Sequence, residues 1–433
     1  MATTIQDAAE CDVLVIGGGP AGSTAAALLA DAGRDALLVD KSAHPRFHIG
    51  ESLLPRNAAV LKRLGMLDAV HAMGVRKPGA EFVSDRTGRS CAFAFRHALN
   101  PPYPHAWQVQ RAEFDAALFA NAARCGARTA ERTRVTGVRF ASPGERATVT
   151  AAGPDGEALI RPRFVLDASG RDAFLASKLQ LKEADKRNST AAVYAHFRGV
   201  ERREGELDGY ISIHLAEDGW FWLIPLPGDV MSVGFVANQS AWKRRQGSPR
   251  DLFLERIMAS PTVSARMTAA ELASEIVSTG NYSYRACRGH GDGFLMIGDA
   301  YGFVDPMFST GVLMAMTAGE LGAEAVDAWL DDPRRGRALC ARAGRELARG
   351  MDRINWLIYR VNDPVLRSLF MAPRNALGMR DGLVSLLAGN LRGDWRTAVP
   401  VLAFKTVYRT ASLLHRFGFG PAIPETYPAL AAE

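Results

Sequence analysis

Residues 11–22 read CDVLVIGGGPAG, and from them the fold of the N-terminal part of the chain can be predicted. Its first half is a short apolar run with the composition of a buried β-strand. Its second half places Gly17, Gly19 and Gly22 in the pattern G-x-G-x-x-G. Where this pattern joins a strand to a helix, the turn binds the pyrophosphate of a dinucleotide at the helix N-terminus. We therefore predict a dinucleotide-binding turn that includes Pro20 and Ala21.

The following residues complete a βαβ unit. Small residues at 20–32 predict a helix, Gly33 stands where that helix ends, and residues 36–39 predict a second parallel strand. Asp40 closes this strand, at the distance from the glycines where an acid accepts hydrogen bonds from ribose hydroxyls. Lys41, directly after it, joins the predicted cofactor-binding residues.

Patterns farther along the chain extend this architecture. Residues 164–166 and 294–297 predict two more buried parallel strands, each leading into a glycine-containing turn. Alternating patterns predict antiparallel strands at 132–140, 146–151, 191–199, 210–215, 220–225 and 230–237. From Ser309 to about Phe417 the pattern is helical and is divided by Pro333, Pro364, Pro373 and Pro400.

The predicted fold class is α/β, with three parts. A Rossmann-type dinucleotide-binding domain is assigned to residues 1–80, 106–187 and 273–330. An inserted antiparallel β-sheet domain for the substrate is assigned to 81–105 and 188–272, and a C-terminal helical region to 331–433.

The composition excludes several classes of protein. The 433 residues are 48% hydrophobic and 23% charged, which is typical of a globular chain. A net charge of +6 is too small to indicate nucleic-acid binding. The five cysteines include no C-x-x-C pair, so we expect neither a disulfide framework nor a metal site. No leader pattern and no apolar run of about 18 residues are present, so we expect a cytoplasmic protein without a transmembrane segment.

Two further stretches resemble the FAD-binding fold of the aromatic-hydroxylase superfamily. Arg111 precedes an amphipathic helix, and Asp299 lies in a Gly-Asp-Ala turn. The resemblance implies that both residues contact the flavin nucleotide and that the cofactor is FAD. Only one strong dinucleotide fingerprint is present, so no second domain for NAD(P)H is predicted. A separate flavin reductase is therefore the implied source of reduced FAD.

Four motifs narrow the resemblance to the flavin-dependent halogenases. They are PRFHIGESLLP at 45–55, KPGAEF at 77–82, WFWLIP at 220–225 and FVDPMFSTG at 303–311. The third fits W-x-W-x-I-P and the fourth fits F-x-x-P-x-x-S-x-G. From residue 11 to about residue 311, their order and spacing are similar to those of this family, whose members also end in a helical region.

The resemblance assigns roles to these motifs. Lys77 is the implied catalytic residue, which either binds and polarises hypohalous acid or forms a haloamine. Ser309, an expected helix N-cap, forms the implied halide site with Thr310 and Gly311, because backbone N–H groups at a helix start bind anions. Pro306 and Gly311 are also implied FAD contacts. The implied wall between flavin and substrate consists of Trp220, Trp222, Ile224, Pro225, Glu51 and Ser52.

Without the resemblance, these residues have structural interpretations. A lone lysine is usually a solvated surface charge, and two tryptophans on one strand face are usually core residues. His105, His214 and Glu51 are expected near the pocket, but the sequence assigns no role to either histidine.

One position departs from the tryptophan halogenases. That branch has a glutamate directly before the S-T-G element, whereas this chain has Phe308. The sequence therefore resembles the branch that acts on phenols, pyrroles or carrier-tethered aryl groups, whose activated rings have less need of a helping carboxylate.

The helical region is basic. Residues 332–417 contain sixteen basic and six acidic residues. Most of these charges are expected to lie on solvated helix faces, and they also predict attraction to an acidic carrier protein that bears a tethered substrate.

The leading hypothesis is a two-component halogenase. It uses reduced FAD, dioxygen and chloride or bromide to form hypohalous acid, which Lys77 relays to an electron-rich aromatic substrate. The alternatives are an FAD-dependent aromatic monooxygenase, a reductase similar to the geranylgeranyl reductases, and an inactive flavoprotein whose helical region binds a partner.

Overall fold

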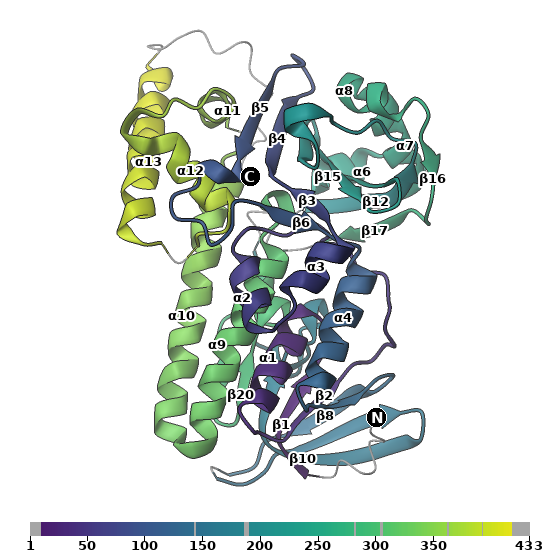
Figure 1. Cartoon of the computed structure of the whole chain (residues 1–433), viewed down its shortest axis with the longest axis vertical. Helices are drawn as coiled ribbons and strands as arrows, with labels where there is room; N and C mark the ends of the chain where they lie inside the picture. The colour runs from purple at the N-terminus through teal and green to yellow at the C-terminus, as the bar shows by residue number, and fades with distance from the viewer. Residues whose placement is uncertain are drawn as a thin grey trace.

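The computed structural model describes residues 10–142, 144–185, 190–280, 283–303, 306–361, 363–391 and 393–417, without the side chains of 238–240 and 306. These residues form two large sheets and a set of long helices (Figure 1). The expected α/β fold, with a parallel sheet, a second sheet and C-terminal helices, is confirmed.

The first sheet is built on the predicted βαβ unit. β1 (Glu10–Ile16) pairs in parallel with β2 (Ala36–Val39) and with β10 (Gly156–Asp167). β20 (Phe294–Met296) pairs in parallel with β10, which confirms both strands predicted before the glycine-containing turns. The sheet order is β19-β20-β10-β1-β2-β7, and β9 and β8 extend it from β10. The remaining strands are β7 (Arg128–Ala130), β8 (Arg134–Arg139), β9 (Thr148–Gly153) and β19 (His290–Gly291).

Helices α1 (Pro20–Asp31), α4 (Arg111–Arg124) and α9 (Gly311–Asp331) pack together beside this sheet (Figure 1). α1 begins at Pro20 as predicted, and Gly33 follows its end with φ +79°. A Cβ on Gly319 would lie 2.5 Å from the carbonyl oxygen of Ala21. Glycine at this position therefore allows α9 to approach the first turn of α1 closely.

The second sheet has the order β16-β12-β15-β14-β13-β4-β5, with β17 paired to β12. Its pairs are antiparallel, except that β13 and β4 run in parallel. The strands predicted at 191–199, 210–215, 220–225 and 230–237 are confirmed. Their bounds are β4 (Gly79–Ser84), β5 (Ser90–Ala94), β12 (Thr190–Arg198), β13 (Ile211–Leu215), β14 (Gly219–Leu226), β15 (Val230–Asn238), β16 (Glu271–Leu272) and β17 (Val277–Gly280).

The two faces of the second sheet have different neighbours, because successive side chains point to opposite faces. Phe221 and Phe235 belong to a separate hydrophobic core that includes Phe253 of α7 (Pro249–Ala259). Trp220 and Trp222 belong instead to the core that includes the first sheet. α6 (Gln239–Arg244) and α8 (Pro261–Ser264) lie near α7, on the same side of the second sheet (Figure 1).

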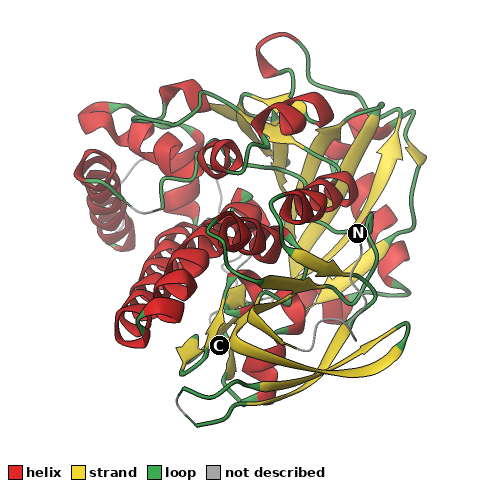
Figure 2. Ribbon diagram, turned by 60° about the horizontal axis from the view of Figure 1, so that its bottom comes forward, coloured by secondary structure: helices red, strands yellow, loops and turns green. Residues whose placement is uncertain are grey.

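The C-terminal part, from Gly311 to Arg416, is mainly helical in the residues that the structure describes. α9 is followed by α10 (Pro333–Ile358), α11 (Pro364–Met371), α12 (Met379–Leu387) and α13 (Trp395–Arg416), which Figure 2 shows in red. Pro333 and Pro364 begin helices, as predicted. The prediction for Pro400 is wrong, because α13 continues through this buried residue. Pro400 is the sixth residue of α13 and removes one hydrogen bond of the helix, and its buried ring packs closely on Gly382 of α12, where an added Cβ would lie 2.6 Å from the Pro400 Cβ.

Short elements connect these parts. β3 (Val75–Lys77) pairs with β6 (Ala106–Gln108), and β11, β18 and β21 form a three-stranded sheet. The others are α2 (Asn57–Arg63), α3 (Leu67–Met73), α5 (Phe174–Lys178), β11 (Lys182–Ala184), β18 (Tyr284–Ala286), β21 (Gly302–Phe303), η2 (Phe95–His97), η3 (Gly170–Asp172), η4 (Gly205–Leu207), η5 (Ala265–Met267), η6 (Gly298–Ala300), η7 (Pro306–Phe308) and η8 (Ala376–Gly378). The second sheet begins at Gly79 and extends to Gly280, and the three-domain division of the chain remains a proposal.

Candidate functional site

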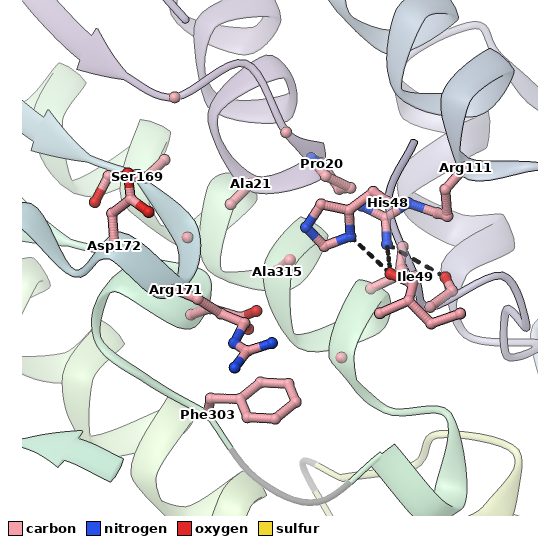
Figure 3. Close-up of a pocket in the computed structure, with 18 of the residues that line it drawn as sticks. Pro20, Ala21, His48, Ile49, Arg111, Ser169, Arg171, Asp172, Phe303 and Ala315 are labelled. Atoms are coloured by element: carbon pink, nitrogen blue, oxygen red, sulfur yellow. Dashed lines mark hydrogen bonds between the residues drawn. The ribbon is translucent and has the colours of Figure 1, made fainter. Parts of the chain in front are cut away.

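A cavity of about 830 Å³ is lined by residues of both large sheets. The glycine turn, the segment 46–52, the cavity-facing strands of the second sheet and the start of α9 all contribute residues. In Figure 3, Pro20 and Ala21 lie near Ala315, with Arg111 and His48 on one side and Arg171 and Phe303 on the other. The volume is within the range of about 300–1,000 Å³ that is usual for cofactor sites.

The three glycines of the turn differ in the space around them. A Cβ on Gly17 (φ +106°) would lie 2.3 Å from the Ala168 carbonyl oxygen, and one on Gly22 would lie 1.9 Å from the Gly17 carbonyl oxygen. Gly19 is different: its Cβ would meet only the Arg46 Nη2, at 3.9 Å. Gly17 and Gly19 line the cavity, so the fold requires glycine at 17 and 22, while Gly19 leaves space for a ligand.

Asp40 both lines the cavity and fixes the glycine turn. Its Oδ2 accepts a hydrogen bond from the Gly18 N–H at 2.7 Å, and its Oδ1 accepts one from the Ser42 N–H at 2.8 Å. The Oδ2 also accepts from the Arg46 Nη2 at 3.4 Å, so the carboxylate organises the turn and its Oδ1 keeps a lone pair for a ribose hydroxyl. Lys41 also lines the cavity and forms an ion pair with Asp172 across it.

Arg111 holds the segment 46–52 against α4. Its guanidinium donates to Asp115 at 2.8 and 2.9 Å and to the carbonyl oxygen of Ile49 at 2.8 Å. The side chain is buried and contributes to the cavity lining. His48 accompanies it, and burial, with the nearby Arg111 charge, lowers the pKa of His48 to about 4. A neutral imidazole therefore faces the cavity at neutral pH.

Asp299 reaches the cavity from the opposite side. Burial raises the pKa of Asp299 to about 6, and the charges of Arg111 and Arg171 limit this rise. The hydroxyl of Tyr284 donates to the Asp299 carbonyl oxygen at 2.7 Å and fixes the turn η6. The predicted cofactor contacts Arg111 and Asp299, almost 190 residues apart in the sequence, thus line one cavity.

The second sheet supplies one wall of the cavity. Trp220, Trp222 and Ile224 line it, and the two indole rings lie 5.9 Å apart. The indole N–H of Trp222 donates to the Ser232 hydroxyl at 3.1 Å, which fixes the ring. Pro225, which was predicted for this wall, does not line the cavity, because strand alternation turns it to the other face.

Glu51 and Ser52 line the cavity beside this wall. The Oε1 of Glu51 lies 2.7 Å from the Nε2 of His196, whereas its buried Oε2 and the Ser52 hydroxyl have no hydrogen-bond partner among the described residues. Backbone hydrogen bonds tie residues 51–53 along β6, from Leu53 to Trp107 and from Val109 to Glu51. Residues 51–53 are called the partition segment below.

Lys77 lies behind the partition segment and does not line the cavity. The side chain is 1% exposed, and its Nζ donates to the Leu53 carbonyl oxygen at 2.9 Å. The Nζ also lies 5.2 Å from the centre of the Phe95 ring. Burial lowers the pKa of Lys77 from 10.5 to about 7. The amine is therefore neither a surface charge nor part of the cavity.

The start of α9 differs in detail from the expectation. Ser309 is not the N-cap: it has φ +57°, and the N-cap is Thr310, with no side-chain capping bond. Ser309 and Gly311 line the large cavity, and Thr310 lines a small neighbouring one. The side chain of Pro306 lies outside the described residues. Three consecutive residues thus bring the first turn of α9 to the cavity, where free backbone N–H groups favour an anion.

The two histidines that were named without a role lie elsewhere. His214 is on the face of β13 away from the cavity, with its Nδ1 2.7 Å from the Thr262 hydroxyl. Burial lowers the pKa of His214 to about 3. His105 packs between Tyr103 and Trp107 and does not line the cavity.

The sequence reasoning missed several cavity residues. They are Phe47, His48, Arg171, Tyr194, Ile211 and Ile213. The isoleucines and Tyr194 follow from strand alternation once the cavity-facing side of the sheet is known. The others lie in loops or short turns, for which the sequence contains no periodic signal.

No group of three or more His, Cys, Asp or Glu side chains is arranged to hold a metal ion in the part of the chain that the structure describes. All five cysteines are free thiols.

The glycine turn and the cavity are those of an FAD-binding flavoprotein. Residues 10–319 match the family described as "FAD binding domain". The space left open at Gly19, the acid at Asp40 and the N-termini of α1 and α9 fit the phosphates and ribose of this cofactor.

Within this class, the chain belongs to the flavin-dependent halogenases. It is 35% identical over 320 residues to a tryptophan 2-halogenase from Chondromyces crocatus, covering 72% of this chain and 60% of that one. It is 30% identical over 335 residues to a 1H-pyrrole-2-carbonyl-(peptidyl-carrier protein) chlorinase from Pseudomonas fluorescens, covering 72% and 74%. The chain thus spans less than two thirds of the first relative.

Solved structures share the fold over nearly the whole chain. A flavoprotein/dehydrogenase from Cytophaga hutchinsonii has a TM-score of 0.84 and 29% identity, covering 94% of this chain and 99% of that one. A flavin-dependent brominase has a TM-score of 0.77 and 26% identity, covering 93% and 100%. The likeness therefore includes the second sheet and the helical region.

Proposed function

We propose that this chain is the halogenating component of a two-component system. A separate flavin reductase supplies reduced FAD, and the products are halide-substituted aromatic compounds. The observation that carries the proposal is the position of Lys77, a buried amine that the partition segment separates from the FAD cavity.

The overall chemistry balances in two stages. When bound, reduced FAD would supply the two electrons with which dioxygen, a halide ion and a proton yield hypohalous acid and water, leaving oxidised FAD. Hypohalous acid then replaces one ring hydrogen of the aromatic substrate by halogen and releases water. The chain must keep these stages apart and guide the acid from the first to the second.

The start of α9 is the proposed halide site. The N–H groups of the first turn have no partners within the helix, and the helix dipole favours a negative ion there. Ser309 and Gly311 place this turn at the cavity wall, so the ion is held where it is to be oxidised.

Lys77 is the proposed relay. An ammonium with a pKa of about 7 can hydrogen-bond hypohalous acid and polarise it, and the neutral amine can form a haloamine. Both forms are populated near neutral pH, so the structure supports the relay without choosing between these routes. Trp220, Trp222 and the partition segment keep the substrate ring away from the flavin.

One phenylalanine lies beside Lys77, and others belong to the same hydrophobic core. Phe95 faces the Nζ, and the rings of Phe82, Phe308 and Phe370 meet at centre distances of 4.8–6.4 Å. These rings are buried and offer no charged partner to an amino-acid substrate. We therefore propose a phenol, a pyrrole or a carrier-tethered aryl group as the substrate, with Phe308 replacing a helping carboxylate.

The basic helical region supports the carrier-tethered form of the substrate. One relative is named for a pyrrole carried by a peptidyl-carrier protein, and residues 332–417 carry a net positive charge that would attract an acidic carrier. We also propose that the protein is cytoplasmic, because its free thiols fit a reducing compartment.

A flavoprotein that oxidises or reduces its substrate directly is the second candidate. The similarity to the Cytophaga hutchinsonii flavoprotein/dehydrogenase favours it. A monooxygenase would form oxygenated product without halide, and a reductase similar to the geranylgeranyl reductases would react without dioxygen.

One experiment separates these functions. The protein is incubated with FAD, a flavin reductase, NADH, bromide and a panel of phenols and pyrroles, free and carrier-tethered. Halogenation predicts products with the paired bromine isotope masses, only when both dioxygen and bromide are present. Oxygenated products without bromide, or turnover without dioxygen, would contradict the proposal.

A further inference from the structure

The last helix, α13, presents two apolar faces. One face, with the buried residues Thr397, Pro400, Phe404 and Tyr408, packs against α11 and α12, and the rings of Phe404 and Tyr408 also contact Trp356 of α10. A helix at the surface of a globular protein normally needs only one such face. The apolar residues on the opposite side therefore require a separate explanation.

That opposite side is here called the outer face. It consists of Trp395, Val399, Leu402 and Leu413 of α13 with the adjoining Phe417. Their spacing places them opposite Phe404 on the helix. They are 73%, 61%, 61%, 55% and 70% exposed, and together they form most of the strongly exposed large apolar side chains among the described residues. Leu377 of the neighbouring η8 is 80% exposed.

Within α13 every charged side chain is basic, and the acid next to the outer face in the sequence is Asp394, the N-cap before Trp395. From Trp395 to Phe417 the sequence contains no aspartate or glutamate. Arg396, Arg409 and Arg416 are exposed, and the guanidinium of Arg396 lies 5.6 Å from the Trp395 ring centre. Figure 1 shows α13 as the outermost helix of the helical region, on the side away from α6–α8.

We propose that the outer face of α13 binds the surface of an anionic membrane. A row of Trp, Val, Leu and Phe side chains can enter the boundary between head groups and acyl chains, while flanking arginines contact anionic head groups. No described helix is both long and apolar enough to cross a membrane, so α13 would lie on the surface.

The charge pattern makes two other binding partners less suitable for the outer face, namely a second copy of the chain and an acidic carrier protein. In a dimer formed through this face, arginines would meet arginines, because α13 has no acid with which to pair. An acidic carrier protein would match the arginines, but the row itself is apolar, and the more extensive basic surface of α10 is available for such a partner. The proposal does not depend on the reaction that the enzyme catalyses.

Vesicle binding by the full chain tests the proposal. The FAD-loaded protein is sedimented with vesicles of phosphatidylglycerol and phosphatidylcholine, and separately with phosphatidylcholine alone. We expect binding to the anionic vesicles, weakened by salt. The double variant Val399→Glu/Leu402→Glu should bind at least about tenfold more weakly, because it places two charges in the apolar row.

A matched control is Leu159→Glu in β10, because Leu159 is 61% exposed, as is Leu402, but is on a different element. This variant should bind vesicles like the unmodified chain. Bound FAD and thermal unfolding should be unchanged in both variants, which shows that they are folded.

The following results would overturn the proposal. The unmodified chain fails to bind anionic vesicles, or Leu159→Glu weakens vesicle binding as much as the double variant does, or the chain binds both vesicle types equally. A dimer in light scattering that Val399→Glu/Leu402→Glu converts to a monomer would instead assign the face to self-association. Loss of binding to an acidic carrier protein, with no vesicle binding, would assign it to that partner.

Discussion

The Nζ of Lys77 donates a hydrogen bond to the carbonyl oxygen of Leu53 at 2.9 Å. Leu53 directly follows Glu51 and Ser52, which line the FAD cavity, whereas Lys77 does not. A segment three residues long therefore stands between the cofactor site and the amine. This arrangement suits a reaction in which a small oxidant moves from the cofactor site to the amine, while the substrate does not reach the flavin.

Replacing Lys77 should uncouple oxidant formation from halogenation. We expect Lys77→Ala to lower halogenated product by at least about 10²-fold, the contribution of a positioned acid–base group. Flavin oxidation and peroxide release should continue, because the FAD cavity is untouched. Mass spectrometry of the product and a peroxide assay on the same reaction measure both.

Two further variants sharpen this test. Lys77→Arg should not restore activity, because arginine stays protonated and its planar guanidinium is larger than the buried amine. Lys182→Ala removes a surface lysine that lies over Tyr284, and it should leave halogenation unchanged. Full activity of Lys77→Ala would refute the relay.

The buried amine should make stability depend on pH. Burial lowers the pKa of Lys77 from 10.5 to about 7. Between these values the unfolded chain keeps the proton that the folded chain has released, so the contribution of Lys77 to stability rises with pH by up to about 1.4 kcal/mol per pH unit. Below pH 7 both states bind the proton, and this pH dependence disappears.

Denaturant unfolding of the natural chain and of Lys77→Met measures this effect. The methionine variant should be the more stable protein near pH 7, and its advantage should shrink as the pH rises toward 10. A difference that stays constant over this range would show that the amine is solvated in the folded protein.

The glycine turn offers two variants with different expected outcomes. Gly22→Ala places a Cβ 1.9 Å from the Gly17 carbonyl oxygen, so we expect loss of both stability and FAD binding. Gly19→Ala meets no atom nearer than 3.9 Å, so the fold should keep its unfolding temperature. Its Cβ enters the space expected for the phosphates, and FAD affinity should fall by about tenfold or more.

Thermal unfolding without FAD and a flavin fluorescence titration separate these two effects. If both variants lost stability equally, the space at Gly19 would serve chain packing rather than the cofactor.

Phe370 should affect both stability and the aryl substrate. Its ring lies 4.8 Å from that of Phe82 and 4.9 Å from that of Phe93, and it is 1% exposed. Phe370→Ala should destabilise the chain by about 3–5 kcal/mol and change the KM of the aryl substrate, with FAD affinity unchanged.

Phe253→Ala is the matched control, because Phe253 is as deeply buried but lies in the separate core behind the second sheet. It should lower the unfolding temperature to a similar extent without changing the KM. An equal change of KM in both variants would show that the effect is one of stability alone.

Local sequence patterns were sufficient to predict the secondary structure at the start of the FAD-binding part. Strand alternation, the glycine spacing and the position of Asp40 are local features, each set by residues close together in the sequence. For this reason β1, α1 and β2 have the predicted bounds within one or two residues. The strands of the second sheet and the positions of α10 and α11 follow from the same local rules. Where a local rule competed with packing, at Pro400 and at Ser309, the prediction was wrong.

The site was harder to infer because its residues come from distant segments. The sequence alone predicted a dinucleotide-binding turn, and its resemblance to the halogenases implied a catalytic role for Lys77. The folded structure was needed to show that this lysine is buried, hydrogen-bonded to Leu53 and outside the cavity. It was also needed to show that Pro225 points away from the cavity, whereas Tyr194 and Ile213 line it. The burial of Lys77 and its separation from the cavity depend on how β3, β6 and the second sheet pack together. Such long-range contacts leave no periodic signal along the chain.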